Sequence, residues 1–247
     1  MNKNLERRLD TTVRASYIRR WYQKPWGKVS LVIGLILAGF FVYYLYLTTG
    51  YVNDIKNFDI NKTVTDFRQD KQFANLVTSD DPSRGSAEAK VVVVAFEDFQ
   101  CPFCRQNQAD LKKILDKYGD KILFIYRDFP IPSVHPEAEN AAEAANCAFQ
   151  QGKFWEYHDQ LFARQDELSA STYNQIAETL GLDISAFNRC VNTKAYSKEI
   201  EADIKAGQDL GVIGTPTFFI NGQMFPGVLS YDFMDKVIGF LLSNSQK

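Results

Sequence analysis

Two cysteines, Cys101 and Cys104, lie three positions apart in the stretch FEDFQCPFCRQ and offer the clearest chemistry in this 247-residue chain. A C-x-x-C pair can bind a metal ion, form a structural disulfide or act as a redox couple. A structural zinc site needs four ligands, commonly from two such pairs or from a pair and histidines. The remaining candidate ligands, none at paired spacing, are Cys147, Cys190, His135 and His158. Haem attachment would need His at position 105, which is Arg105, so both kinds of metal site are disfavoured.

The elements around the pair favour the redox couple. The apolar run Val91 to Phe96 predicts a strand buried on both faces, and a helix is expected to follow it. Cys101 is expected to be its N-cap, exposed at the helix start, with Pro102 at the first helical position. The N-terminal N–H groups would stabilise a thiolate there. Cys104, one turn later and facing the core, is placed to resolve a mixed disulfide.

The rest of the chain predicts further elements in the order β-α-β, a helical block and β-β-α. A second strand at 122–129 would pair in parallel with the first. Helices are expected at 136–151, 154–164, 171–180, 184–191 and 195–210. An Asn-Gly turn within 215–225 predicts a hairpin. In the last helix, at 231–242, the buried residues are expected to be Phe233, Val237, Phe240 and Leu241.

The N-terminal part has the charge pattern of a membrane anchor. Residues 1–28 carry eight Lys or Arg and two Asp or Glu, a net charge of +6, whereas the whole chain has −2. Residues 29–48 carry no charge and would span about 30 Å as a helix. A cleaved signal peptide is the alternative, but bulky tyrosines follow the apolar core and no small-residue cleavage site does. We therefore expect a cytoplasmic basic arm, a transmembrane helix, and a tether at 49–80 with one strand at 73–77.

From about residue 80 to 242 the chain resembles the DsbA-like family of thiol-disulfide oxidoreductases. The resemblance rests on FEDFQCPFC, HPEAENAAEAANCAFQQGKFWEYHDQLF and GTPTFFING. It implies an α/β thioredoxin-like fold over 81–247, with a helical insertion at about 133–210. It also implies that Cys101 exchanges disulfides, that Cys104 resolves them, and that Thr215-Pro216 is a cis peptide beside the pair. Pro102 and Phe103 would complete the surroundings of the sulfur.

The family pattern also bears on the other two cysteines. Cys147 and Cys190 would be two buried thiols or a structural disulfide, and a similar pair in relatives favours the disulfide. His135 and His158 are expected to be structural.

This chain departs from the family at two positions near the active-site pair. Phe103 stands where the best-known oxidants of the family have His. Ala95 stands where many thioredoxin folds bury a carboxylate, so Glu97 either replaces that group or is a solvated strand end.

These patterns predict a membrane-anchored, extracytoplasmic enzyme that forms disulfides in exported proteins. Expected partners are cysteine-containing exported proteins, a membrane thiol oxidase that reoxidises the pair, and the lipid bilayer through residues 29–48. No cofactor, metal or nucleic acid is expected, and we expect a monomer at the cell membrane. Three alternatives remain: a disulfide reductase or isomerase, a non-catalytic binding module for unfolded chains, and a metal-thiolate sensor.

Overall fold

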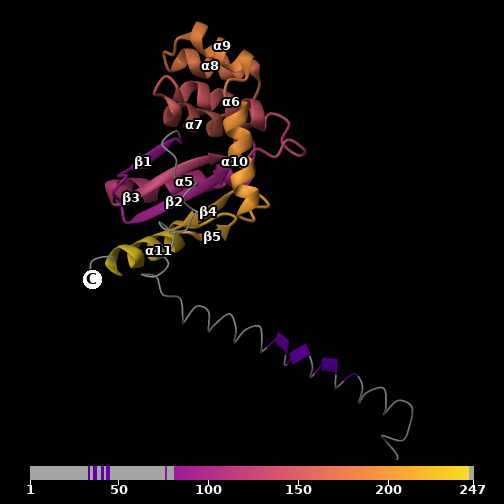
Figure 1. Ribbon diagram of the computed structural model, residues 1–247, viewed down its shortest axis with the longest axis vertical. Coiled ribbons are helices and arrows are strands. Elements are labelled where there is room, and N and C mark those ends of the chain that lie inside the picture. Colours follow the sequence, from indigo (N-terminus) through magenta and orange to yellow (C-terminus); the bar gives the residue numbers. More distant parts are fainter. Residues whose placement is uncertain are drawn as a thin grey trace, which may run out of the picture. The chain divides into compact units, whose positions relative to one another are not determined.

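The computed structural model describes residues 81–244, Leu76 and seven residues nearer the N-terminus (Figure 1). Those seven are helical, apolar and exposed: Ile33, Ile36, Leu37, Phe40, Phe41, Tyr43 and Tyr44. They fall within the predicted span at 29–48, most of which lies outside the described residues, as does the basic arm. No helix among the described residues has the length and hydropathy needed to cross a bilayer.

A five-stranded sheet forms the centre of the described domain, in the order β1-β3-β2-β4-β5. The central strands, β2 (Val91–Glu97) and β3 (Ile122–Asp128), pair in parallel and are buried along their whole length, as the sequence predicts. The other strands run antiparallel to their neighbours: β1 (Ser83–Gly85), β4 (Thr217–Ile220) and β5 (Gln223–Pro226). This arrangement is the α/β thioredoxin-like fold expected from the element order.

Two groups of helices cover the two faces of this sheet. On one face, α5 (Pro102–Tyr118) and α11 (Tyr231–Asn244) contribute Leu111, Ile114 and Ile238 to a core with the valines of β2. On the other face, α10 (Ser197–Asp209) lies over β3 (Figure 1). Its Ile204 packs against a second core, which includes Val92 and Val94 of β2 and Ile125 of β3. Because both faces of the sheet are covered, the apolar runs at 91–96 in β2 and 122–126 in β3 are buried on both sides.

The helical insertion contains α6 (Ala138–Phe149), α7 (Phe154–Ala163), α8 (Ala170–Thr179) and α9 (Ile184–Thr193), and α10 returns the chain to the sheet. These bounds agree with the predicted helices to within about two residues. The insertion has its own core of alanines and aromatic side chains, which also includes the active-site cysteines. The insertion and the thioredoxin part therefore share one core at the active site.

The strand β1 was not expected, because its segment has the composition of a loop. It pairs with β3, and Gly85 adopts a φ of 95°. A Cβ at this position would come within 1.9 Å of the Ile122 carbonyl oxygen, so only glycine fits. The strand predicted at 73–77 lies outside the described residues except for Leu76, which is in a turn.

The last helix buries a different face from the one predicted. Its buried residues are Met234, Ile238 and Leu241, whereas Phe233 and Phe240 are 39% and 52% exposed. Of the predicted set, only Leu241 is fully buried. The choice of the aromatic positions was wrong because the helix meets the sheet through a narrower aliphatic face, and Phe233 packs at its edge against Phe225.

Candidate active site

The turn between β2 and α5 positions the cysteine pair. Asp98 holds this turn: its carboxylate accepts hydrogen bonds from the backbone N–H of Gln100 and of Ile131. The Asp98 Oδ2 atom also lies 2.8 Å from Nδ1 of His135, which ties the loop after β3 to the turn. Cys101 is then the N-cap of α5, and Pro102 begins the helix, as predicted.

Cys101 is not exposed, contrary to the expectation from its N-cap position. Only 3% of its surface is accessible, and Cys104 is fully buried. Two segments distant in sequence enclose it. When protonated, Cys101 donates to the Thr215 carbonyl at 3.3 Å. Gln165, in the short helix η2 (Gln165–Glu167), donates to the carbonyls of Phe99 and Cys101. The sequence could not show these contacts because they depend on where the insertion packs.

The two thiols have opposite acidities. A hydrogen bond with the Cys104 side chain lowers the pKa of Cys101 to about 6 against the effect of burial, and the Thr215 side chain and the N–H groups of Phe103 and Cys104 assist. Burial raises the pKa of Cys104 well above 9, and the Cys101 and Glu97 side chains raise it further. Cys101 is therefore the thiolate and Cys104 the thiol at neutral pH.

The residues around the pair form an exposed rim. Pro102 is exposed, and the Phe103 side chain is 58% exposed and so does not cover the sulfur. On the opposite side, Thr215-Pro216 is a cis peptide, preceded by Ile213, which is 95% exposed. Two exposed apolar side chains thus lie near the sulfur: Phe103 is two positions from Cys101, and Ile213 is two positions from Thr215, which contacts Cys101.

A buried polar group beneath the pair was only partly foreseen. Glu97 is fully buried, so its interpretation as a solvated strand end is wrong. Its carboxylate accepts a hydrogen bond from Gln108, which also donates to the Cys104 carbonyl. His158 is buried 3.9 Å from the same carboxylate. The spacing of Gln108, one turn after Cys104 on α5, was the available signal for its role.

The second cysteine pair lies apart from this site. Cys147 in α6 and Cys190 in α9 form a disulfide across the insertion. Among residues 81–244, the one cluster of three possible metal ligands is Glu143 with these two sulfurs. Because both sulfurs are in the disulfide, that cluster has no thiolate to offer a metal ion.

A thioredoxin-like sheet with the cysteine pair at the start of α5 and a helical insertion between β3 and β4 is the arrangement of the DsbA-like class of thioredoxin-fold proteins. The sequence model of the thioredoxin family matches residues 77–239, and the chain belongs to that family.

Solved structures agree with this assignment. The thiol-disulfide exchange protein α-DsbA2 of Wolbachia pipientis is 26% identical, with a TM-score of 0.62 over 74% of this chain and 97% of its own. BdbD of Bacillus subtilis shows the same fold at 22% identity and a TM-score of 0.60, over 66% of this chain and 94% of its own.

Sequence relatives include much longer proteins. The Na⁺/H⁺ antiporter NhaA 3 of Salinispora tropica is 41% identical over 147 residues, which is 60% of this chain. NhaA 1 of Salinispora arenicola is 40% identical over the same length. In both cases the match spans 22% of the antiporter. The similarity thus concerns a minor part of those proteins.

Proposed function

We propose that this protein is a membrane-anchored, extracytoplasmic thiol-disulfide oxidoreductase that forms disulfides in exported proteins through Cys101 and Cys104. The observation that carries the proposal is the pairing of an acidic Cys101, with a pKa of about 6, and a buried Cys104 of much higher pKa at one helix N-terminus. In a disulfide between them, Cys101 is the preferred point of attack, because its sulfur lies at the helix start next to the exposed rim, whereas Cys104 is completely buried.

Oxidation of a substrate proceeds in two exchanges. A substrate thiolate attacks the Cys101 sulfur, forms a mixed disulfide and breaks the Cys101–Cys104 bond, so that Cys104 leaves and takes up a proton. A second substrate thiolate then attacks the substrate's own sulfur in the mixed disulfide and releases Cys101 as a thiolate. Two substrate thiols are oxidised and the enzyme disulfide is reduced. Stabilisation of the Cys101 thiolate favours the reduced enzyme and makes the oxidised form a good oxidant.

The exposed rim suits unfolded substrates. Phe103, Val134 and Ile213 are 58%, 66% and 95% exposed, and Val134 belongs to the loop that His135 ties to the active-site turn. Large exposed apolar side chains near one another commonly mark a binding surface. We therefore propose that the rim contacts apolar side chains beside a substrate cysteine. Binding of this kind without redox activity is the alternative function as a module for unfolded chains.

The proposed location follows from the sequence. The basic arm at 1–28, the uncharged segment at 29–48 and the tether at 49–80 would hold the domain at 81–247 outside the cytoplasm. The membrane oxidase that reoxidises Cys101–Cys104 and exported cysteine-containing proteins would be its partners. The disulfide between Cys147 and Cys190 supports an oxidising compartment, because structural disulfides persist there.

The proposal is tested by trapping and by measuring the reduction potential. Cys104→Ser should accumulate mixed disulfides with exported proteins, whereas Cys101→Ser should accumulate none. The wild-type potential should lie between about −270 mV, the value of thioredoxin, and about −120 mV, that of DsbA. A potential below this interval would indicate a reductase. Catalysis of disulfide shuffling without net oxidation would indicate an isomerase. If the cysteines never undergo exchange, the remaining function is that of a non-catalytic binding module for unfolded chains.

A further inference from the structure

Several buried polar atoms have no hydrogen-bond partner within the described residues, and two of them face one another beneath the cysteine pair. They are Oε1 of Glu97 at the end of β2 and Nε2 of His158 in α7. Glu97 is fully buried and His158 is 3% exposed. Since a buried polar atom without a partner destabilises the folded protein, such a pair next to an active site needs an explanation.

These groups belong to a chain of contacts that runs from the surface to the backbone of Cys104, and the charge of the Glu97 carboxylate raises the pKa of the Cys104 thiol. The Asp159 carboxylate is 61% exposed and lies 2.9 Å from Nδ1 of His158. The opposite ring nitrogen, Nε2, lies 3.9 Å from Oε2 of Glu97. That oxygen accepts from Gln108 at 2.9 Å, and the same Gln108 nitrogen lies 3.2 Å from the Cys104 carbonyl. A shift of about 1 Å would bring His158 and Glu97 into hydrogen-bonding distance.

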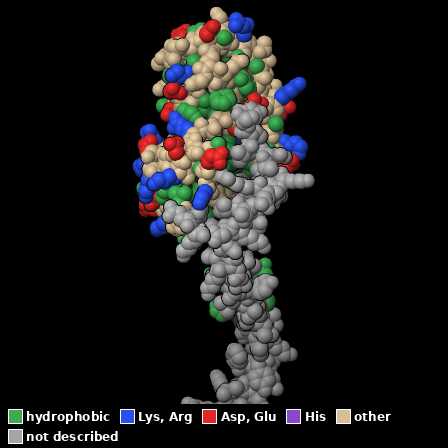
Figure 2. All heavy atoms as spheres, turned by 60° about the vertical axis from the view of Figure 1, so that its left-hand side comes forward, with side chains coloured by type: hydrophobic (Ala, Val, Ile, Leu, Met, Phe, Trp, Pro, Cys, Tyr) green, Lys and Arg blue, Asp and Glu red, His purple; other side chains and the backbone are tan. Residues whose placement is uncertain are grey.

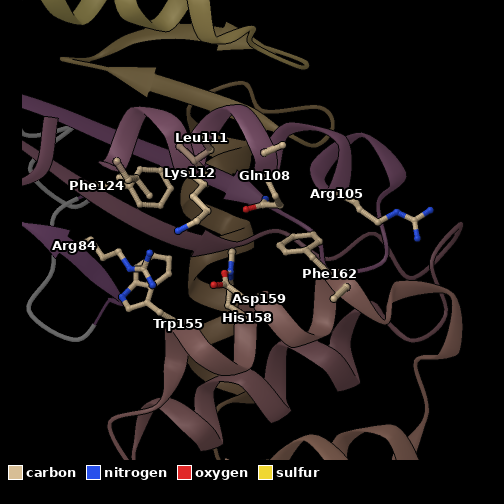
Figure 3. Close-up of a pocket in the computed structure, with 13 residues that line it drawn as sticks. Arg84, Arg105, Gln108, Leu111, Lys112, Phe124, Trp155, His158, Asp159 and Phe162 are labelled. Atoms are coloured by element: carbon tan, nitrogen blue, oxygen red, sulfur yellow. The ribbon is translucent and has the colours of Figure 1, made fainter. Parts of the chain in front are cut away.

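A cavity of about 460 Å³ brings solvent to this chain of contacts. It lies between α5 and α7, and Figure 3 shows His158 and Asp159 at its floor, with Gln108 and Lys112 above them and Trp155 beside them. In Figure 2, hydrophobic side chains gather where the helical block meets the rest of the domain. The cavity thus reaches Gln108 and His158, both of which neighbour Glu97, and it is not lined by the rim residues Phe103, Val134 and Ile213.

Charges around the cavity keep Asp159 ionised. Burial opposes ionisation, but the hydrogen bond with His158 and the nearby Arg84 and Lys112 lower the pKa of Asp159. Burial likewise opposes the His158 imidazolium, yet the Asp159 and Glu97 carboxylates outweigh it and raise the pKa of His158. An imidazole between two carboxylates is a suitable proton carrier near neutral pH.

We propose that His158 and Asp159 form a proton relay that connects Cys104, through Glu97, to solvent in this cavity. The relay rests on the proposed function of Cys101–Cys104 as a redox couple. His158 and Asp159 act through Glu97 and are therefore positioning residues. The helical insertion would then contribute to the reaction itself as well as enclosing the site.

The relay serves the step in which Cys104 changes its protonation. During reoxidation, the Cys101 thiolate attacks a partner disulfide, forms a mixed disulfide and releases one partner thiolate. The Cys104 thiol then gives its proton to Glu97, which passes it to Nε2 of His158, and the imidazolium releases a proton to water in the cavity. The Cys104 thiolate attacks Cys101 and releases the second partner thiolate. In substrate oxidation, the proton travels inward by the same groups.

The two exchanges can be followed separately with a symmetric dipyridyl disulfide and the reduced full-length protein. Attack by Cys101 releases the first equivalent of chromophore, and attack by Cys104 releases the second. We expect Asp159→Asn and His158→Gln to slow the second release about tenfold or more, because proton transfer by positioned groups contributes at least that much. The first release should stay within twofold of wild type. Asp159→Glu, which keeps a carboxylate, should recover most of the second rate.

Glu156→Gln is the matched control, since it removes one negative charge from the same helix, where Glu156 pairs with Lys153. It should leave both releases unchanged. A second release at the wild-type rate in Asp159→Asn would overturn the relay. Asp159→Asn tests the relay even if His158→Gln fails to fold. The Asp159 side chain is mostly exposed, so its replacement should leave the fold intact. Release of only one equivalent by the wild-type protein would instead contradict the redox couple.

Discussion

At the scale of single residues, the position between the cysteines separates this chain from its family's strongest oxidants. Phe103 offers the Cys101 sulfur neither a donor nor a positive charge and points away into solvent. The stabilisation of the thiolate comes instead from Cys104, Thr215 and backbone N–H groups. The resulting pKa of about 6 lies within the interval expected from the sequence, between the 3.5 of DsbA and the 7 of thioredoxin.

Phe103→His should make the protein more oxidising. A protonated imidazole beside the sulfur would lower the pKa of Cys101, and each unit corresponds to about 30 mV in the potential of a two-electron couple. The absorbance of the thiolate at varied pH and equilibration with glutathione measure the two quantities. Phe103→Leu is the control and should change neither by much. An unchanged potential in Phe103→His would show that the Thr215 side chain and the backbone dominate.

At the scale of elements, a buried ionic network joins β3 to α10 and to the segment before β1. Arg127 is buried and pairs with Asp81 and with Asp203, each at 2.7 Å. The next residue, Asp128, accepts a hydrogen bond from Asn146 in α6. Burial raises the pKa of Asp128 to about 7, although the bond from Asn146 opposes this and the Arg127 charge does too. The insertion is thus attached to the sheet through the bond between Asn146 and Asp128, an acid that is partly protonated at neutral pH.

Asp128 should make the folded protein less stable as the pH rises. Its pKa is raised on folding, so its stabilising contribution is complete below about pH 4 and is lost as the pH rises through about 7. Asp128→Asn, which imitates the protonated acid, should therefore raise the free energy of unfolding by a few kcal/mol at pH 8.5 and by little at pH 4. Urea unfolding at both values measures this. Asp116→Asn, at an exposed position, should show no such difference.

The Cys147–Cys190 disulfide should support the insertion without setting the redox potential. It closes a loop of 43 residues, for which the chain-entropy relation gives about 4 kcal/mol. The double Ser variant should lose roughly that much unfolding free energy, and the potential of Cys101–Cys104 should stay within about 10 mV of wild type. Thermal unfolding and glutathione equilibration test the two parts. A large shift in potential with unchanged stability would assign the second pair a redox role.

Local sequence patterns predicted the elements better than the contacts between them. The central strands, the N-cap cysteine and the hairpin at Asn221-Gly222 follow from apolar runs and turn residues, which act over a few positions. The burial of Cys101 and of Glu97 does not, because Gln165, Thr215 and His158 approach them from distant segments. The buried face of the last helix was predicted wrongly for the same reason. Periodicity shows that one face of the helix is apolar, but the contact with the sheet determines which residues of that face are buried.

At the scale of the whole molecule, the proposed anchor decides where the chemistry takes place. Residues 1–48 should keep the full chain in the membrane fraction and orient the domain outward, because the basic arm favours the cytoplasmic side. Protease added from outside should remove the domain beyond residue 50 and leave a short membrane-bound fragment. Replacing the eight Lys and Arg of the arm by Gln should weaken this orientation. A soluble protein that starts near residue 50 would instead reveal a cleaved signal.

The hydrogen bonds from Gln165 to the carbonyls of Phe99 and Cys101 have a consequence for protein engineering. The insertion resembles a removable module, since its helices pack on one another and are joined by their own disulfide. Excising it to obtain a minimal thioredoxin would, however, remove the Gln165 donor from both carbonyls, and within the described residues only the Cys101 carbonyl would keep another one, the Arg105 N–H of α5. The turn that carries Cys101 would then lose the side chain that holds it in place. A chimera that exchanges insertions between homologues should therefore keep an amide donor equivalent to Gln165. This side chain is then a design constraint when an insertion and a thioredoxin part from different proteins are combined.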